Sequence, residues 1–483
     1  MANGGIIGKV NNPTSTTATG VWQQEEQYEA KVTDTWPQRA LFTTKSLRFN
    51  SGSSDYLVRT MDSAPTLATK ATISYWFKRT KLDAWGGMGG YSASSGTGTN
   101  NFQIGFNDAN YGYFWQNSPA LYFYTSAVNR DPSAWKNVVI SIDTTQGTAS
   151  NRVKYYENGI RTTSFVTETY PSQNDALNVN KNGNLFSVGR FTSTGGSQFY
   201  YDGYLAETIL VDGQQLAPTS FGVANSDGVW TPIPYSGTFG NNGFNLQFEN
   251  SAALGTDSSP NGNTFTVNNL TSIDQSTDYP VVNYATLNPL YKPYASATFS
   301  EGNLKISTAT GWSGNKATMG VSQGKWYWEI KLSGTMTDHQ HGVQQENVNE
   351  GIGNPENTIG TTVFFNQDGG EMKTNGTATT ADYGLFSTGD IMGIALDMDS
   401  GSYGQITIYK NGTALVSNFN LSSSSTLVMP FSSIVNSTAE YNFGSPPYAI
   451  SSSNADGNGY GNFEYAPPSG YYALNTANLA EFG

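Results

Sequence analysis

Cysteine is absent from this chain of 483 residues. Its absence excludes a disulfide-stapled scaffold, thiolate zinc sites and cysteine nucleophiles. Charged residues are also scarce, at 13% of the chain, and 24 Lys and Arg against 37 Asp and Glu give a net charge of −13. A chain this acidic is a poor candidate for binding nucleic-acid phosphates or anionic lipid. No nucleic-acid partner is therefore expected.

Long apolar runs are missing as well. The chain has no run of about 18 apolar residues, so neither a transmembrane helix nor membrane insertion is expected. The opening residues, MANGGIIGKV, show neither the charged segment nor the apolar segment of a secretory signal. We therefore expect folding in a reducing cytoplasm, without export through a cleaved signal.

Aromatic residues and glycine are abundant. The chain holds 29 Tyr, 25 Phe, 10 Trp and 53 Gly. That many rings can fill sizeable cores, and the mixture with Thr, Asn and Gly favours strands joined by tight turns. At roughly 100–200 residues per domain, two to four domains are expected.

Strand patterns fill two long stretches of the chain. ATISYWFKRT (Ala71 to Thr80) alternates, with Ile73, Tyr75 and Phe77 on one face. Similar short segments recur at roughly 8–12-residue spacing without a convincing helix, which is typical of antiparallel β-sandwiches. The predicted organisation is an N-terminal arm (1–44), a first sandwich (45–222), an ordered Asn/Gly/Ser/Pro-rich connector (223–295), a second sandwich (296–445) and a C-terminal extended tail (446–483).

The first 44 residues differ from the rest. They are small and polar at first, and Trp22, Tyr28 and Trp36 then follow within a short span. Aromatic residues are common anchors at protein interfaces. An arm that docks on other proteins of an assembly is therefore predicted, with a flexible tail as the alternative.

One hairpin is written twice. VKYYENGIRT (Val153 to Thr162) and ITIYKNGTAL (Ile406 to Leu415) share an apolar strand, a Tyr and an Asn-Gly pair. Asn-Gly supplies the two positive-φ residues of a type I′ turn. Val153 and Tyr155 are expected to face a core, as are Ile406 and Ile408. The tyrosines next in sequence, Tyr156 and Tyr409, are expected to lie on the opposite face of their strands.

The second series of strands resembles the SPRY domain. GKWYWEIKL (Gly324 to Leu332) is similar to that family's opening strand, and GDIMGIALDMDSGSYGQITIYKNG (Gly389 to Gly412) to its central motif. The first series, including WKNVVISID, VKYYENG and YDGYLAETILVDGQQL, resembles laminin-G-like, concanavalin-A-like domains. Both resemblances imply jelly-roll-like antiparallel sandwiches, so the expected fold is all-β with two such sandwiches in tandem.

The arm and the C-terminus carry a third resemblance. GIIGKVNNPT, GVWQQEEQYEAKVTDTWP and YYALNTANLAEFG are similar to segments of structural proteins of marine tailed phages. The resemblance implies a virion protein assembled in the host cytoplasm. It also implies a homo-oligomer, with a trimer favoured.

Few residues suit catalysis or metal binding. The only histidines, His339 and His341, could share a face and bind a metal with nearby carboxylates, or lie in an exposed polar loop, which we favour. Asp368 and Glu371 fit a hairpin loop better than a hydrolytic pair. No enzyme, metal site or cofactor is predicted.

Calcium is the one ion left open. Laminin-G-like domains sometimes hold it through loop carboxylates and carbonyls. Asp83, Asp108 and Asp131 lie in suitable loops, without forming a convincing ligand set.

Carbohydrate recognition suits the residue types best. Aromatic faces stack on sugar rings, and amide and carboxylate groups hydrogen-bond hydroxyls. Two loops of the first sandwich carry such residues, although any one ring could be core. The candidate ligand-binding residues are Trp85, Tyr91, Asn101, Asp108, Asn110, Tyr113 and Trp115.

The expected function is adhesion by a phage tail fibre or similar appendage. It would contact a host-surface glycan or protein through sandwich loops, and other virion proteins through the arm. One alternative is a capsid or tail decoration protein with a structural role only. A second is an extracellular lectin or glycan hydrolase.

Overall fold

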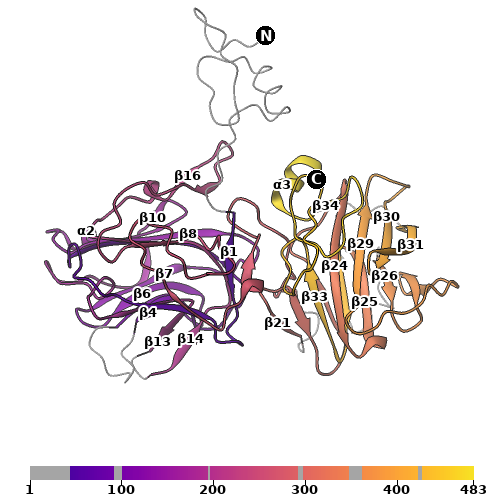
Figure 1. Cartoon of the computed structure of the whole chain (residues 1–483), viewed down its shortest axis with the longest axis horizontal. Helices are drawn as coiled ribbons and strands as arrows, with labels where there is room; N and C mark the ends of the chain where they lie inside the picture. The colour runs from indigo at the N-terminus through magenta and orange to yellow at the C-terminus, as the bar shows by residue number, and fades with distance from the viewer. Residues whose placement is uncertain (1–43, 92–100, 194–195, 292–296, 347–361, 423–426) are drawn as a thin grey trace, which may run out of the picture. The chain divides into compact units, whose positions relative to one another are not determined.

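The computed structural model describes residues 44–91, 101–193, 196–291, 297–346, 362–422 and 427–483 (Figure 1). The chain divides into two units, Met1–Thr44 and Lys45–Gly483. The proposed docking anchors Trp22, Tyr28 and Trp36 lie outside the described residues. All that follows concerns the second unit.

The first sandwich consists of two antiparallel sheets. One sheet has the order β10 (Ile160–Thr162), β9 (Val153–Glu157), β8 (Lys136–Asp143), β3 (Lys70–Arg79), β15 (Gly203–Asp212), β1 (Ser46–Phe49) and β20 (Gln275–Ser276), with β18 (Phe244–Leu246) paired to β15. The other has the order β11 (Phe165–Thr169), β7 (Leu121–Val128), β6 (Tyr111–Gln116), β5 (Phe102–Phe106), β4 (Gly86–Tyr91), β12 (Leu185–Val188), β2 (Tyr56–Thr60) and β19 (Thr266–Asn268).

The second sandwich also has two sheets. One runs β21 (Thr298–Ser300), β22 (Lys305–Ser307), β33 (Ser437–Asn442), β24 (Lys325–Gly334), β29 (Ile391–Asp397), β30 (Gln405–Lys410) and β31 (Thr413–Asn420), with β34 (Tyr472–Ala473) parallel to β24. The other runs β23 (Ser313–Lys316), β32 (Val428–Ile434), β25 (His339–Gln345), β26 (Thr362–Asn366), β27 (Glu371–Thr374) and β28 (Thr377–Ala378).

The remaining elements are short. They are two hairpins, β13 (Arg190–Thr192) with β14 (Gln198–Tyr200) and β16 (Gly222–Ala224) with β17 (Trp230–Pro232), the helices α2 (Ala149–Arg152) and α3 (Thr476–Phe482), and the 3₁₀ turns η1 (Pro218–Ser220), η2 (Ser272–Asp274) and η3 (Met336–Asp338). In the described part of the chain, neither helix has the length or the apolar character to span a bilayer. The all-β fold with two sandwiches in tandem is confirmed.

The two sandwiches share one strand order. The sheet β10-β9-β8-β3-β15-β1 matches β31-β30-β29-β24-β33-β22 strand for strand in chain order. Both Asn-Gly turns have positive φ, at 46° and 77° for Asn158 and Gly159, and 48° and 79° for Asn411 and Gly412. The doubled hairpin therefore reflects a doubled architecture.

Each turn is also anchored in the same way. The Oδ1 atom of Asn158 accepts from the backbone N–H of Asn137 at 2.8 Å, and that of Asn411 from Ile391 at 2.9 Å. Both asparagines thus bridge to the strand before the hairpin. An asparagine side chain can satisfy a backbone donor in this way where the strand ladder stops.

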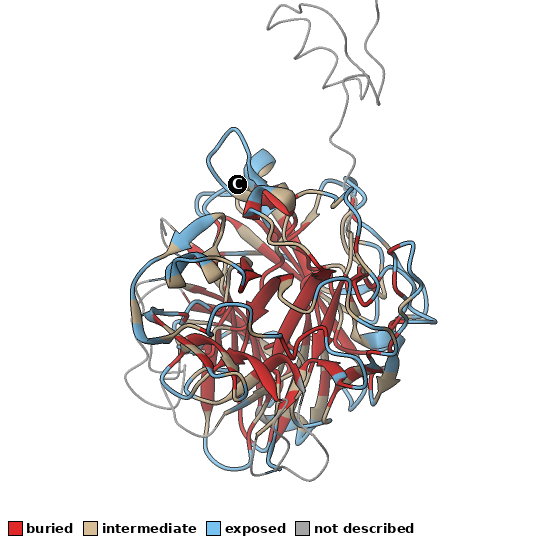
Figure 2. Ribbon diagram, turned by 90° about the vertical axis from the view of Figure 1, so that its left-hand side faces the viewer, coloured by how far each residue is buried: buried red, intermediate tan, exposed pale blue. Residues whose placement is uncertain are grey.

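Each sandwich has a core of its own. Figure 2 shows strands inside the molecule as buried and many of the surrounding loops as exposed. Val153 and Tyr155 lie in the first core, and Ile406 and Ile408 in the second, as the hairpin pattern predicts. The next residue, Tyr156, packs on the other face of its sheet. There it meets Phe221 and its neighbours, so β8 and β9 are covered on both faces.

The connector is part of the first sandwich. Its strands β18, β19 and β20 add to β15, β2 and β1, which extends both sheets. Side chains satisfy several backbone N–H groups along this Asn-rich segment: the carboxylate of Asp257 accepts from the backbone N–H groups of Asn245, Ser259 and Asn263. An extended, ordered connector without long strands results.

Two segments with similar sequences, YATLN (284–288) and YALN (472–475), lie side by side. Ala285 of the connector donates to the carbonyl of Leu474 at 3.0 Å, and Tyr284 pairs with Asn475. The tail is predicted to be extended, but it ends in α3, because the Asn475 side chain caps that helix by accepting from the N–H of Asn478. Capping by asparagine satisfies an otherwise free helical donor.

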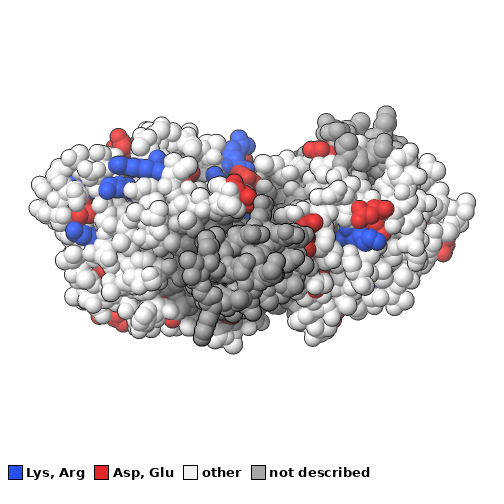
Figure 3. All heavy atoms as spheres, turned by 90° about the horizontal axis from the view of Figure 1, so that it is seen from above, with Lys and Arg blue, Asp and Glu red and all other residues white. Residues whose placement is uncertain are grey.

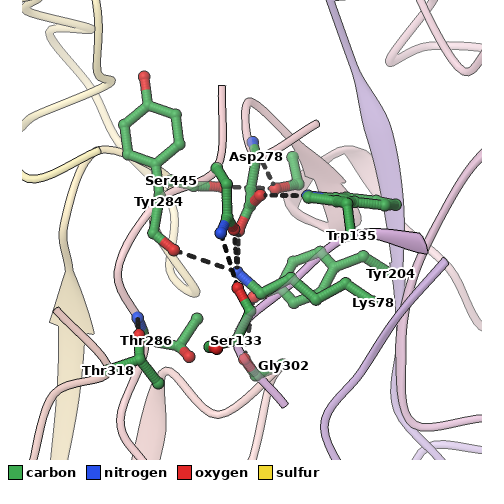
Figure 4. Close-up of polar contacts among 12 residues, drawn as sticks. Lys78, Ser133, Trp135, Tyr204, Asp278, Tyr284, Thr286, Gly302, Thr318 and Ser445 are labelled. Carbon is green, nitrogen blue, oxygen red and sulfur yellow. Dashed lines mark hydrogen bonds and ion pairs between the residues drawn. The ribbon is translucent and has the colours of Figure 1, made fainter. Parts of the chain in front are cut away.

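A buried group of polar residues, the polar clasp, joins the connector to the first sandwich (Figure 4). It consists of Lys78, Trp135, Asp278 and Asn283. The Lys78 ammonium donates to Asp278 Oδ2 at 2.8 Å and to Asn283 Oδ1 at 2.7 Å, and the Trp135 indole donates to Asp278 Oδ1 at 2.7 Å. Lys78 has no exposed surface, and its ammonium donates a third hydrogen bond to the carbonyl of Tyr284 at 3.1 Å.

Contacts with the second sandwich continue from the clasp. Ser276, two residues before Asp278, shares a 2.6 Å hydrogen bond with Ser445, and the Tyr204 hydroxyl donates to the carbonyl of Gly302 at 3.0 Å. Arg48 of β1 donates to the carbonyl of Pro446 at 3.1 Å. The two sandwiches and the connector are thus linked by buried polar contacts as well as by chain continuity.

Candidate binding face of the first sandwich

Strands β6 and β7 carry aromatic side chains on both of their faces. Phe114, Leu121 and Phe123 point into the first core. Because side chains alternate along a strand, Tyr113 and Trp115 of β6 and Tyr122 and Tyr124 of β7 point away from that core. The outer face of these two strands therefore carries rings along its length.

The outward rings pair across the two strands. Tyr113 lies opposite Tyr124 with ring centroids 5.6 Å apart and stacked, and Trp115 lies opposite Tyr122 at 5.9 Å. Tyr113 is buried, whereas Trp115, Tyr122 and Tyr124 are half-buried. Cross-strand aromatic pairs of this kind stabilise a sheet and also present flat apolar surface.

The β13–β14 hairpin packs on the neighbouring part of this face, where the sheet has almost no side chains. A Cβ on Gly87 would lie 2.4 Å from the backbone nitrogen of Phe191, and one on Gly90 would lie 2.7 Å from the Phe191 Cβ. Glycine in β4 is therefore required for the hairpin to approach. This accounts for Gly87 and Gly90 in the β4 sequence GGMGGY.

The hairpin adds two more rings. Phe191 and Phe199 stack on each other at 5.0 Å, and Phe191 meets Tyr113 edge-on at 5.8 Å. Trp85, just before β4, contacts Tyr113 at 5.5 Å and Phe199 at 5.9 Å. We call the connected set the aromatic face; its members are Trp85, Tyr113, Trp115, Tyr122, Tyr124, Phe191 and Phe199.

The face carries no formal charge of its own. Burial raises the pKa of the Tyr113 hydroxyl well above its ordinary value, and burial also raises the pKa of Tyr124, so both phenols stay neutral. The Tyr113 hydroxyl has no hydrogen-bond partner among the described residues, and the rings of Trp115, Tyr122 and Tyr124 are half-buried. Neutral rings with hydroxyl tips can stack on an apolar ring face and hydrogen-bond at its rim.

The sequence-predicted residues divide into two groups. Trp85, Tyr113 and Trp115 all belong to the aromatic face. Tyr91 ends strand β4, and its side chain lies outside the described residues. The three polar candidates are elsewhere, so the structure brings the rings together but not the amides and carboxylate.

Each polar candidate has a structural role or lies apart. Asn101 has no exposed surface, and its backbone N–H donates to Asn117 Oδ1 at 3.0 Å. Asn110 has φ of 65° and bridges Asp83 and Arg79 at 2.7 Å and 3.2 Å. Asp108 is exposed in the β5–β6 turn, at the strand ends away from Trp115. The structure therefore does not bring these three polar residues together with the rings.

The sequence reasoning missed four members of the face. Tyr122 and Tyr124 alternate with Leu121 and Phe123 in the stretch ALYFYTS, which is a readable pattern. Phe191 and Phe199 could be found only from the packing of their hairpin, because nothing local to them indicates that β4 lies underneath. The sequence therefore predicts a ligand site on loops, whereas the rings lie mainly on the surface of strands.

The histidines are buried rather than exposed, which corrects the prediction of a polar loop. They lie in strand β25, and the His339 Nδ1 atom is 3.1 Å from His341 Nε2. The other nitrogens are occupied too: His339 Nε2 pairs with the carbonyl of Ser333 at 3.1 Å, and His341 Nδ1 with the Tyr441 hydroxyl at 2.9 Å. With all four ring nitrogens in this chain of hydrogen bonds, none is left to bind a metal.

The candidate carboxylates also have structural partners. Glu371 accepts from Asn366 Nδ2 at 2.8 Å and lies 3.7 Å from the Lys373 ammonium, while Asp368 is exposed in the adjacent turn. Asp131 closes a turn by accepting from the backbone N–H of Ser133 at 2.8 Å. Within the described ranges, no three His, Asp or Glu side chains gather as a metal site would require.

Comparison with known proteins identifies the second sandwich. Residues 325–446 match the family model of the SPRY domain, which spans β24 to β33 and the residues just beyond. This segment is a SPRY-like β-sandwich, as its sequence predicts. The match covers about a quarter of the chain and leaves the first sandwich outside it.

Solved structures include three similar SPRY domains. The SPRY domain of human HERC1 is 16% identical, with a TM-score of 0.26, and the match covers 32% of this chain and 96% of that one. The TRIM65 PSpry domain is 14% identical (TM-score 0.26, 33% and 92% covered), and a human SPRY domain is 14% identical (0.25, 32% and 98%). Among curated proteins no relative was found.

Proposed function

We propose that this protein is a non-enzymatic adhesion protein that binds a surface polysaccharide on the aromatic face of its first sandwich. The observation that carries the proposal is the set of half-buried rings of Trp115, Tyr122 and Tyr124 side by side on a rigid sheet. Rings held by strand pairing lose little further freedom when a ligand stacks on them. A ligand with flat apolar faces and hydroxyl edges fits that surface.

The second sandwich supports the same type of role. SPRY domains are in general protein-interaction modules, which suits a chain whose task is attachment. Among the residues described, the histidines and candidate acids are engaged in turns and in a buried hydrogen-bond chain, which supports a non-catalytic role. Charged side chains on the surface seen in Figure 3 are scattered and gather into no patch of one sign.

The biological setting belongs to the same proposal. A phage tail fibre or similar appendage would carry the protein, with residues 1–44 attached to other virion proteins and several copies acting together. Weak glycan sites repeated on a homo-oligomer gain strength through avidity. The polar contacts between the two sandwiches favour a rigid appendage that presents the aromatic face at a fixed place.

A glycan array probed with the full chain tests the binding. We expect one group of polysaccharides to bind, and the double variant Trp115→Ala/Tyr122→Ala to lose that binding by tenfold or more. Tyr403→Ala, an exposed ring on the second sandwich, serves as the control and should bind normally. Full binding by the double variant, or no glycan bound by the wild-type chain, would leave the decoration role as the better account.

A further inference from the structure

The opposite side of the β13–β14 hairpin holds an arginine whose charge is not neutralised. Phe191 pairs with Phe199 in this hairpin, and Arg190 pairs with Tyr200. Because side chains alternate, Arg190 and Tyr200 point away from the side on which Phe191 and Phe199 meet the aromatic face. There they meet Tyr56 of strand β2.

The guanidinium is held flat against these tyrosines. Its Cζ lies 3.6 Å from the ring centroid of Tyr56 and 6.0 Å from that of Tyr200, and the two rings are 6.2 Å apart. Gln198 fixes the arrangement, since its Oε1 accepts from Arg190 Nη1 at 3.2 Å and from the Tyr200 hydroxyl. A stacked, tethered guanidinium has little freedom left to lose on binding a ligand.

No carboxylate balances this charge. Within the described residues no Asp or Glu oxygen lies within ion-pair distance of Arg190, although the chain has 13 more acidic than basic residues. Arg190 is half-buried, and among the described residues its Nη1 donates a hydrogen bond to Gln198. Its Nε atom is buried, so the terminal Nη1 and Nη2 groups are the donors that a ligand can reach. The arginine side chain is permanently charged and presents its donors as a planar fork.

We propose that Arg190, with Tyr56 and Tyr200, binds an oxyanion, a carboxylate or a sulfate, on the polysaccharide that the aromatic face holds. The inference rests on the proposed function and narrows its ligand to an acidic glycan. A planar fork of N–H groups matches the two oxygens of such an anion and can bind it in a bidentate way. The adjacent rings of Tyr56 and Tyr200 add flat surface for the sugar that carries the anion.

The negative charge of the whole protein does not prevent this. Charges farther away than the Debye length, about 8 Å at physiological salt, are largely screened, whereas a direct contact with Arg190 is screened much less. The protein as a whole repels polyanions weakly, and one arginine attracts an anion locally. The protein should therefore select glycans that carry an acidic group at one position. It should have no general affinity for polyanions such as nucleic acid.

Binding of matched polymers to the full chain tests the inference. The probes are polygalacturonate with its carboxyl-reduced neutral form, and dextran sulfate with dextran. Arg190→Gln should weaken binding of the polyuronate or of the sulfated polymer about tenfold or more, as expected for a lost hydrogen bond to a charged group. The preferred polymer tells which anion is bound, and neutral polymers should be unaffected.

Two further variants separate the effect of the Arg190 charge from that of its planar donor geometry and from that of the protein's net charge. Arg190→Lys keeps the charge but not the fork and should recover only part of the binding. Arg161→Gln makes the same charge change at an exposed position of β10 and should bind as the wild type. Melting curves confirm that each variant is folded.

The outcomes also separate this inference from the proposed function. If Arg190→Gln binds every polymer as the wild type does, the inference is overturned. Loss of binding in Trp115→Ala/Tyr122→Ala would then still support the aromatic face. Conversely, binding of acidic polymers that depends on Arg190 but not on Trp115 or Tyr122 would keep the oxyanion site and refute the aromatic face.

Discussion

At the scale of single residues, the buried chain of hydrogen bonds through His339 and His341 has the clearest consequence. Proton order along it follows from chemistry: His339 donates from Nε2 to the carbonyl of Ser333 and accepts at Nδ1, so His341 donates from Nε2. With both rings neutral, His341 Nδ1 can only accept, so Tyr441 donates to it at 2.9 Å rather than to the carbonyl of Phe431, which lies at 3.3 Å. Both imidazoles are neutral in this arrangement, and a proton added to either one breaks a link.

Acid should therefore destabilise the second sandwich through these histidines. Burial lowers the pKa of His339 to about 4 and that of His341 well below its ordinary value. The unfolded state, with a pKa of about 6.5, binds more protons below that pH, so stability falls as pH drops. The titration of His339 alone should lower the free energy of unfolding by about 2 kcal/mol between pH 7 and pH 5.

Urea unfolding at several pH values checks this. His339→Gln should be less stable at pH 7 but should lose less stability between pH 7 and 5 than the wild type does. Comparing the two chains removes the opposing effect of Glu329, whose pKa burial raises to about 6. Identical pH slopes for variant and wild type would contradict the proton arrangement.

Glu329 is the other residue with a defined role in the second sandwich. Its carboxylate accepts from the backbone N–H groups of Tyr465 and Glu464 at 2.8 and 3.0 Å, and from Asn442 Nδ2 at 3.1 Å. It therefore fastens the C-terminal tail to strand β24. Glu329 is buried within strand β24, where a carboxylate without hydrogen-bond donors would be unfavourable.

Substitution of Glu329 tests that fastening. The amide of Glu329→Gln cannot accept from all the donors at once. We therefore expect the free energy of unfolding to fall by about 1–3 kcal/mol, as for a buried donor left unpaired. Backbone amides near Tyr465 should exchange hydrogen faster in the variant. Unchanged exchange there would show that the tail is held by Phe463 and its neighbours instead.

At the scale of elements, the strands of both sandwiches were readable from sequence, whereas the aromatic face was not. Alternation and Asn-Gly turns locate the hairpins because they are local properties. The run of glycines in β4 gave no such indication. Its meaning depends on the β13–β14 hairpin, about 100 residues away in the sequence, packing directly on it.

Strand β4 therefore allows a test of the face as a packed element. Gly90→Val places side-chain atoms where the Phe191 Cβ and the Phe102 carbonyl already lie. We expect the free energy of unfolding to fall by about 1–3 kcal/mol because of overpacking. Glycan binding should also weaken, because the hairpin must move. Gly147→Ala, with no atom within 4 Å of the added Cβ, is the matched control. Unchanged binding in Gly90→Val would show that the hairpin does not shape the ligand surface.

At the scale of the whole molecule, the connector and the polar clasp determine how the protein unfolds. The sequence indicated an ordered connector from its aromatics, but not that three of its strands complete the sheets of the first sandwich. Nor did it indicate that Lys78 would be buried against Asp278, 200 residues later. Such contacts depend on the fold as a whole and have no local pattern.

We expect the two sandwiches to unfold in one calorimetric transition, because the clasp and its neighbours couple them. Asp278→Asn leaves the Lys78 ammonium buried without its counter-ion, which should cost about 3–5 kcal/mol and can divide the transition into two. Asp227→Asn, in the exposed β16–β17 turn, is the control. Two transitions in the wild-type chain would contradict the coupling.

The structure of the full chain with the preferred glycan bound is the most direct test of the central claim. Sugar rings should lie against Trp115 and Tyr122 on the outer face of the β6–β7 pair, and an acidic sugar farther along the same polymer should contact Arg190 beyond the β13–β14 hairpin. Density for the glycan on the loops between strands or on the second sandwich, with the aromatic face empty, would contradict the claim.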